Sequence, residues 1–345
     1  MRAPQVSAAS CAADPPVEAV VCVPTFRRPG MLRKTLQSLA DQRSRTSFAV
    51  VVVENDRVRR EGEPVAKSFF EAGLLSGFCV VEERQGNCRA INRAFREARD
   101  RFPAANYFLM IDDDEYAEPD WLALMISAAR DHQVDVVGGP VFSEFPPGTP
   151  GRLLRHPIYW PAYERSGFVP MIYGSGNCLI SRRAFQEVGD PDFDERFNHL
   201  GGGDTHFFTR CRAAGLKAYW QDAARVFETV PRERLRSAWI IRRGLRIGAI
   251  NFHIERTASA TPSAHMRLIA RTVGLVPLSL WRSLKLAAQR KPALVVLHPC
   301  VIALGRILAW FGGAPEQYSL RAMEGKQRNR DVSRGKADEA DAIFS

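Results

Sequence analysis

The sequence predicts an α/β fold in which helices cover a mostly parallel β-sheet. Short apolar runs alternate with longer segments whose apolar residues recur at helical spacing, which is the pattern of a βαβ layer. The strand-like runs are apolar at successive positions, as expected for strands buried on both faces of a parallel sheet. We therefore expect a Rossmann-like sheet in residues 18–137, continued by a second half in residues 138–230.

The expected elements follow in order along the chain. The first strand is expected at Ala19–Val23, and Leu32, Leu36 and Leu39 then recur at helical spacing. Further strands are expected at residues 48–53, 78–81, 107–111 and 178–180, and further helices around residues 66–75, 90–98 and 204–214. Residues 1–17 are expected to form a disordered leader, and residues 316–345 a polar, disordered tail.

Polar residues follow each of the four strands expected in the first half. Parallel strands end at the same edge of a sheet, and ligands of such folds bind beyond that edge. We therefore expect one site to be formed by four segments: Pro24–Pro29, Glu54–Asp56, Glu82–Asn87 and Asp112–Glu115.

Asp112–Glu115 places four carboxylates directly after an apolar run. Adjacent like charges repel one another, and Mg²⁺ or Mn²⁺ would compensate them while taking its remaining ligands from phosphate and water. Asp112 and Asp114 are two residues apart, so both can reach the same side of an extended chain. A solvated acidic turn ahead of a helix near Pro119 is the structural alternative.

Asp204 follows three glycines at the start of an expected helix. It is either an N-cap, which accepts hydrogen bonds from the first turn, or a general base. Three consecutive glycines are unusual at an ordinary cap and would let a substrate approach the backbone. This pattern favours the general base.

Several motifs, in this order, resemble those of family-2 glycosyltransferases of the GT-A fold. They are Val-Pro-Thr-Phe-Arg-Arg-Pro, Val-Val-Val-Glu-Asn-Asp, Ile-Asp-Asp-Asp-Glu-Tyr-Ala-Glu-Pro-Asp-Trp-Leu and Gly-Ser-Gly-Asn-Cys-Leu-Ile. Gly-Gly-Gly-Asp-Thr and Val-Pro-Arg-Glu-Arg-Leu are similar to the succinoglycan type of the bacterial exopolysaccharide branch. The resemblance covers residues 18–250.

This resemblance implies an inverting transfer of a sugar from a nucleoside diphosphate, expected to be UDP, to a hydroxyl of a lipid-linked saccharide. It implies Asp204 as the general base, and Asp112 and Asp114 as ligands of Mn²⁺ or Mg²⁺. Donor binding would involve Pro24, Thr25, Phe26, Arg28, Glu54, Asn55, Asp56, Asn87, Asn92, Asp112 and Asp113. Acceptor binding would involve Gly174, Ser175, Gly176, Asn177 and Gly203. Asn55 and Ile91 depart from the family pattern, which often has Asp and Arg at these positions.

Basic residues concentrate in residues 231–291, which hold 13 Lys and Arg against two acids and so carry a net charge of +11. The rest of the chain therefore carries −1 of the total of +10. Arg232, Arg236 and Arg243 are expected on one face of an amphipathic helix.

Two apolar stretches follow in the same region. Residues 268–288 are expected at a membrane interface, and residues 293–312 are long enough to span a membrane but contain Arg306. We favour helices that lie under the cytoplasmic leaflet over a span, and packed helices remain an alternative. Residues 231–315 are accordingly expected to bind an anionic membrane surface at the cytoplasmic face of the plasma membrane.

Two other functions remain open at this point. A metal-dependent nucleotidyltransferase shares the sheet and the carboxylates, but usually has a Gly-rich phosphate loop and a Lys that Pro24–Arg27 lacks. A basic nucleic-acid-binding protein would interleave its cations with exposed aromatic residues, whereas here they lie beside apolar stretches, so we expect no nucleic-acid partner. The seven scattered cysteines contain no CxxC pair, which argues against a disulfide scaffold and a Cys-type zinc site.

Overall fold

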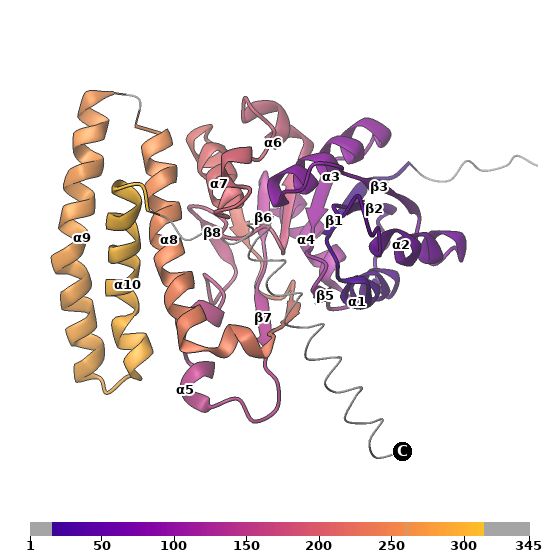
Figure 1. The fold of residues 1–345 in the computed structure, drawn as a ribbon. Coiled ribbons are helices and arrows are strands. Elements are labelled where there is room, and N and C mark those ends of the chain that lie inside the picture. The colour runs from indigo at the N-terminus through magenta and orange to yellow at the C-terminus, as the bar shows by residue number, and fades with distance from the viewer. Residues whose placement is uncertain (1–15, 260, 314–345) are drawn as a thin grey trace, which may run out of the picture.

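A computed structural model describes residues 16–259 and 261–313 of the chain. Its centre is an eight-stranded sheet in the order β3-β2-β1-β4-β9-β6-β10-β8, with helices on both faces (Figure 1). The predicted α/β class is confirmed. Most of the expected leader and all of the expected tail lie outside the described residues.

The first four strands of the large sheet are parallel, as predicted: β2 runs parallel to β1 and β3, and β4 runs parallel to β1. β9 is antiparallel to both β4 and β6, so its first residue, Cys178, lies beside Met110 at the end of β4. The strands of this sheet are β1 (Ala19–Thr25), β2 (Phe48–Glu54), β3 (Gly77–Val81), β4 (Tyr107–Met110), β6 (Val136–Gly138), β8 (Gly167–Val169), β9 (Cys178–Ser181) and β10 (Ala218–Trp220). A smaller sheet contains β5 (Glu115–Ala117), β11 (Val226–Thr229) and β7 (Val141–Glu144).

Alternate residues of the buried strands divide the core between two helix layers. Val21 and Val23 of β1 pack with α1 (Pro29–Ala40), α2 (Gly62–Glu71) and α4 (Trp121–Asp131). Val20 and Cys22 pack with α3 (Asn87–Arg101), α6 (Arg182–Glu187) and α7 (Gly203–Ala213). This two-sided burial explains why the strand sequences are apolar at every position. Three short helical segments lie in the second half: α5 (Gly151–Leu154), η1 (Pro157–Tyr159) and η2 (Glu195–Phe197).

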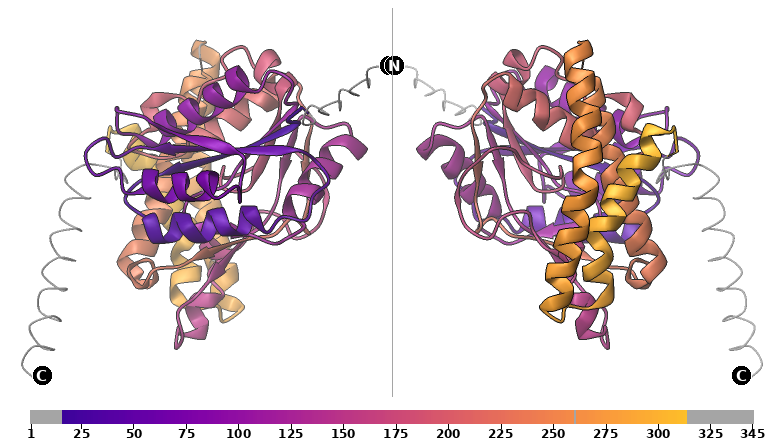
Figure 2. Two further views of the ribbon diagram at one scale, coloured as in Figure 1. Left: turned by 90° about the vertical axis from the view of Figure 1, so that its right-hand side faces the viewer. Right: turned by 90° about the vertical axis from the view of Figure 1, so that its left-hand side faces the viewer.

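Three long helices form a separate layer beside the sheet (Figures 1 and 2). They are α8 (Ser237–Thr257), α9 (Pro262–Ala288) and α10 (Ala293–Trp310), preceded by the short η3 (Arg232–Leu235). α8 joins the main core through Ile250 and Ile254, and α10 packs against both α8 and α9.

One prediction for this layer is wrong. Arg232, Arg236 and Arg243 do not share one helix face, because η3 ends at Leu235 and Arg236 is extended, with φ −74° and ψ 138°. α8 begins only at Ser237, so Arg243 belongs to a different helix from Arg232.

Candidate active site

The polar ends of β1, β2, β3 and β4 lie at one edge of the sheet, as the sequence predicts. Thr25 is paired with Glu54, and Glu54 with Val81, so three of the strands end level with one another. Ile111 continues β4 past Met110, and its amide donates to the carbonyl of Cys22 in β1. The four expected segments therefore start from neighbouring strand ends.

Asp113 ties the end of β4 to the loop after β1. Its Oδ2 accepts hydrogen bonds from Thr25 Oγ1 at 2.8 Å and from the Phe26 amide at 3.2 Å, and its Oδ1 pairs with Arg28 Nη1 at 2.9 Å. The Asp113 side chain is buried. The predicted donor residues Thr25, Phe26 and Arg28 are thus held in place by this carboxylate, while Pro24 is buried within β1.

Asp114 lies between two arginines. Arg28 Nη1 is 2.7 Å from Asp114 Oδ2, and Arg234 Nη2 is 3.6 Å from the same oxygen. Arg234 also forms an ion pair with Glu228 at the end of the smaller sheet. Burial lowers the pKa of Arg234, but the charges of Glu228 and Asp114 outweigh it and raise the pKa, so the guanidinium stays charged.

Our sequence reasoning missed Arg234 as a site residue. It belongs to the Val-Pro-Arg-Glu-Arg-Leu motif, which carried the resemblance but had no role assigned. The motif was the only signal available, because Asp114 and Arg234 are far apart in the sequence.

The half-buried Asp112 and the buried Glu115 form a second acidic part of the site. Burial, and then the charges of Asp114 and Asp113, raise the pKa of Asp112 to about 8. Burial and the charge of Asp112 also raise the pKa of Glu115, whose Oε2 accepts the Asp112 amide at 3.0 Å. Gly176 packs against Glu115 so closely that a Cβ there would lie 2.4 Å from Oε1.

Burial and the neighbouring carboxylates both raise the pKa values of Asp112 and Glu115, and a hard divalent cation at this place would relieve the repulsion between these carboxylates. Within the described residues, no group of three or more His, Cys, Asp and Glu side chains is arranged to hold a metal ion by itself. A cation at Asp112 and Asp114 would therefore need further oxygen ligands from outside the chain, such as phosphate or water.

Glu54, the last residue of β2, is hydrogen-bonded to the loop that follows this strand. Both oxygens of the buried Glu54 accept backbone amides, from Asp56 at 2.8 Å and from Gly62 at 2.7 Å. Asp56 pairs with Arg27 Nε at 2.5 Å, and although burial opposes ionisation, this hydrogen bond lowers the pKa of Asp56. The Arg27 guanidinium also lies 4.8 Å from the centre of the Phe26 ring. Because Arg27 follows β1 and Asp56 follows β2, their ion pair connects the loops after these two strands.

Asn55 binds the loop that leads into α3. Its Nδ2 donates to the carbonyls of Glu82 and Arg84, both at 3.0 Å, and its Oδ1 accepts the Gly86 amide at 2.8 Å. Asn87, the first residue of α3, is exposed. These bonds give Asn55 a structural role in this loop, and its predicted contact with the donor stays a prediction.

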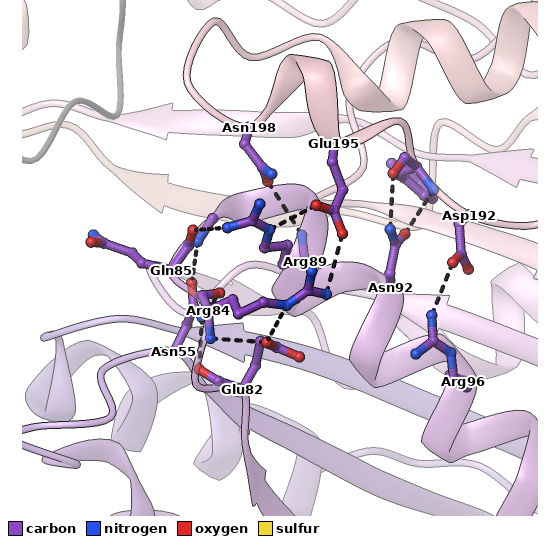
Figure 3. A network of polar contacts seen from close by, with 12 residues as sticks. Asn55, Glu82, Arg84, Gln85, Arg89, Asn92, Arg96, Asp192, Glu195 and Asn198 are labelled. Carbon is purple, nitrogen blue, oxygen red and sulfur yellow. Dashed lines mark hydrogen bonds and ion pairs between the residues drawn. The ribbon is translucent and has the colours of Figure 1, made fainter.

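A polar network joins α3 to the segment that precedes α7 (Figure 3). Glu195 pairs with Arg89 Nε at 2.8 Å and with Arg84 Nη2 at 3.3 Å. Asn92, a predicted donor residue, exchanges two hydrogen bonds of 2.8 and 2.7 Å with the backbone of Phe193. The network therefore fixes the second half of the domain against the first, close to the start of α7.

Asp204 lies in the first turn of α7, and the N-cap position belongs to Gly202, with φ 92°. The N-cap interpretation of Asp204 is therefore wrong. The glycines make room for protein side chains: a Cβ on Gly202 would lie 2.4 Å from Ile250, and one on Gly203 would lie 2.5 Å from Cys88. This close packing positions the start of α7, and our expectation that the glycines let a substrate approach the backbone stays a prediction.

Asp204 belongs to the same edge as the acidic cluster. Gly203, the residue before Asp204, packs against Cys88 in the first turn of α3, and α3 begins beyond the carboxyl end of β3, so Asp204 lies at this edge. Asp204 is partly exposed, and within the described part of the chain its Oδ1 accepts one long hydrogen bond of 3.5 Å, from Thr205 Oγ1. The carboxylate is thus available to a ligand at this edge.

The predicted acceptor segment leads into β9. Gly174 has φ 86°, a conformation that favours glycine, and Ser175 is buried. Asn177 is also buried, and both of its amide hydrogens are used, by the carbonyls of Pro140 and Ala224. Its Oδ1 accepts Trp121 Nε1 at 2.8 Å, so Asn177 joins three parts of the fold.

Comparisons with known proteins agree with this architecture. The model of the glycosyl transferase family 2 matches residues 20–189. The chain is 30% identical over 234 residues to the succinoglycan biosynthesis protein ExoM of Rhizobium meliloti, covering 65% of this chain and 71% of that protein. It is 26% identical over 221 residues to the glucosyl-dolichyl phosphate glucuronosyltransferase of Haloferax volcanii, covering 61% and 65% of the two chains.

A solved structure shows the same fold. The mannosyltransferase PcManGT of Pyrobaculum calidifontis, solved in complex with GDP-Man and Mn²⁺, superimposes with a TM-score of 0.56 at 18% identity. The match covers 87% of this chain and 88% of that one, which confirms the predicted GT-A fold. Together with the family match and the relation to ExoM, it shows that this chain is a glycosyltransferase and belongs to glycosyl transferase family 2.

Proposed function

We propose that the protein transfers a sugar, with inversion at the anomeric carbon, from a UDP-sugar to a hydroxyl of a lipid-linked saccharide. The observation that carries this proposal is that Asp112 and Asp114 lie at one edge of the sheet and that Asp204 begins a helix packed against the first turn of α3 at the same edge. The relation to a protein of succinoglycan biosynthesis supports a role in making an exopolysaccharide or another surface glycan.

Asp204 is proposed as the general base. Direct displacement requires the acceptor hydroxyl to lose its proton on one face of the anomeric carbon while the diphosphate leaves from the other. Asp204 stands at the start of a helix that is fixed by close packing, and its carboxylate is partly exposed. Proton transfer to a positioned carboxylate contributes about 10²–10⁴ to the rate.

Asp112 and Asp114 are proposed to hold Mn²⁺ or Mg²⁺. When bound, the cation would neutralise charge on the leaving diphosphate. Arg28 and Arg234, which flank Asp114, are placed to add positive charge to the same region. Asp113 orients Arg28 and the loop after β1, where the nucleoside is expected to bind.

We further propose that the protein acts at the cytoplasmic face of the plasma membrane, in contact with anionic lipid, because a lipid-linked acceptor stays at the bilayer. Of the helices in the described residues, α10 alone is long and apolar enough to cross a membrane by length and composition, with a mean hydropathy of 1.9. Core helices of soluble proteins share this property.

A donor panel and one substitution test the catalytic proposal. We expect the protein to bind one of UDP-, GDP- and dTDP-sugars in the presence of Mn²⁺ or Mg²⁺, and to release the nucleoside diphosphate on transfer. Asp204→Asn should keep the nucleotide affinity but lose about 100-fold or more in transfer rate. Asp190→Asn, at an exposed carboxylate paired with Arg210, is the matched control and should keep the full rate.

Three results would contradict the proposal. Binding to none of the donors would remove the nucleotide-sugar function, and a rate for Asp204→Asn within a few-fold of the unsubstituted protein would remove Asp204 as the base. Release of pyrophosphate from a nucleoside triphosphate in the presence of a sugar 1-phosphate would favour the nucleotidyltransferase alternative.

A further inference from the structure

The C-terminal helices expose an unusual amount of apolar surface. Eleven of the 18 large hydrophobic side chains that lie exposed in the described residues belong to residues 262–311. Three of them, Leu280, Trp281 and Leu284, follow one another at helical spacing near the end of α9, and Trp281 and Leu284 are 58% and 70% exposed. Contiguous apolar surface of this kind marks an interaction site.

Cations surround these three side chains. Arg282, Lys285, Arg290 and Lys291 are all exposed, and the ammonium of Lys285 lies 5.5 Å from the centre of the Trp281 ring. No Asp or Glu occurs between Arg256 and Gly313. We call residues 280–291 the hairpin tip, because they contain the end of α9 and the turn towards α10.

The hairpin tip lies at the end of the layer that contacts the second half of the catalytic domain. His156 Nε2 lies 3.4 Å from the carbonyl oxygen of Leu294, in the first turn of α10, and the rings of His156 and His298 are 4.8 Å apart. His156 precedes η1, within the half that is expected to bind the acceptor. In Figure 1 this end of α9 and α10 lies near α5.

The structure also shows how α10 is held. Gly248 of α8 and Gly305 of α10 let the two helices approach closely. A Cβ on Gly248 would lie 2.0 Å from the Ile302 carbonyl oxygen, and one on Gly305 would lie 1.9 Å from the Leu245 carbonyl oxygen. Arg306 is buried and bonded to Glu255 of α8 and Thr272 of α9.

We propose that the hairpin tip docks on the surface of an anionic lipid bilayer and that α10 remains packed on α8 without spanning the membrane. This inference rests on the proposed action at a membrane, and it identifies the surface responsible. Apolar side chains enter the interface while the surrounding cations meet lipid phosphates, which is the pattern of an interfacial helix. Docking at this end holds the acceptor-binding half close to a lipid-linked substrate.

Co-sedimentation of the full chain with vesicles tests the proposal. We expect binding to phosphatidylcholine vesicles that contain phosphatidylglycerol, weak binding to pure phosphatidylcholine, and weaker binding at high salt. Trp281→Ser combined with Leu284→Ser should raise the lipid concentration for half-maximal binding about tenfold or more. Arg282→Glu combined with Lys285→Glu should abolish the preference for anionic vesicles.

Matched controls and opposing outcomes are available. Leu74→Ser removes an exposed leucine between α2 and β3, and Arg43→Glu with Arg45→Glu reverses two exposed charges after α1, so both variants should bind vesicles normally. Unchanged vesicle binding by the Trp281 and Leu284 variant would overturn the proposal. The proposal would also be overturned if the unsubstituted protein formed a stable dimer that the Trp281 and Leu284 variant dissociates. Resistance of the unsubstituted protein to carbonate extraction would overturn it too, because such resistance indicates a membrane span.

Nucleotide binding in solution separates this inference from the proposed function. All of these variants should bind the nucleotide as the unsubstituted protein does, because their side chains lie outside the candidate active site. If the unsubstituted protein binds vesicles but no nucleotide, the proposed function fails and the docking surface stands.

Discussion

Arg306→Met tests whether one buried guanidinium holds the C-terminal helices together. The Arg306 side chain is 3% exposed. It pairs with both oxygens of Glu255 and donates to Thr272 Oγ1 at 3.0 Å. α8, α9 and α10 therefore meet at a single polar cluster, and its loss should weaken all three contacts.

The size of the effect follows from what the substitution leaves behind. Removing one partner of a fully buried ion pair costs about 3–5 kcal/mol. Glu255 is 26% exposed and keeps Arg271 at 3.2 Å, so we reduce this loss to about 2 kcal/mol. The lost hydrogen bond to Thr272 adds about 1 kcal/mol. We therefore expect Arg306→Met to lower the free energy of unfolding by about 3 kcal/mol.

Two further variants make the experiment specific. Arg306→Met combined with Glu255→Met removes both charges, so its stability should return to within about 1 kcal/mol of the unsubstituted protein. Arg271→Met removes a cation from the same carboxylate, but this side chain is 66% exposed and its loss should cost less than about 1 kcal/mol.

Urea unfolding measured by circular dichroism gives the free energies, and limited proteolysis after residue 257 reports release of α9 and α10. The reasoning is refuted if Arg306→Met is as stable and as resistant to proteolysis as the unsubstituted protein. It is equally refuted if the double variant is less stable than the single one.

The remaining predictions concern the candidate active site. Arg234→Ala should weaken UDP binding in the presence of Mn²⁺ about tenfold, because it removes a cation beside Asp114, whereas Arg234→Lys should keep most of the affinity. Calorimetry measures both affinities. An Arg234→Ala variant that binds UDP as tightly as the unsubstituted protein would contradict this role. The apparent affinity for Mn²⁺ and UDP should rise with pH up to about 8 and then level off, since Asp112 binds a cation only after losing its proton. Asp112→Asn should remove this dependence on pH. Gly176→Ala should destabilise the protein by about 1–3 kcal/mol in thermal unfolding, because its Cβ would meet the buried Glu115 carboxylate, and an unchanged melting temperature would argue against that packing.

The predicted strands and helices of the first half agree closely with the structure because their signals are local. Four consecutive valines at 50–53 form the centre of β2, and Leu32, Leu36 and Leu39 form the buried side of α1. Helical and strand periodicities depend only on neighbouring residues, so a sequence reveals them directly. The amphipathic helix expected around Arg232 does not form, because Arg236 has extended backbone, and the charge pattern does not encode this conformation.

The sequence identified the acidic cluster, but it did not assign different tasks to its members. Asp112 and Asp113 are adjacent carboxylates, yet Asp113 is bonded to Thr25, Phe26 and Arg28, whereas Asp112 is half-buried beside Glu115 with its pKa raised to about 8. The difference arises in a turn, closed by a hydrogen bond of 3.1 Å from the Glu115 amide to the Asp112 carbonyl oxygen, which gives the two side chains different neighbours. Other segments of the chain determine whether each carboxylate meets hydrogen-bond donors, as Asp113 does, or another carboxylate, as Asp112 does.

By itself, the sequence determined the four parallel strands of the first half, the edge at which their polar ends gather, and the concentration of positive charge in residues 231–291. Only the tertiary structure decided that Arg234 flanks Asp114 and that the glycines before Asp204 admit Ile250 and Cys88. The tertiary structure also decided that Arg306 is buried between three helices while Trp281 and Leu284 remain exposed. The physical reason is that periodicity is written within a few residues, whereas burial and charge pairing depend on partners that folding brings from distant parts of the chain.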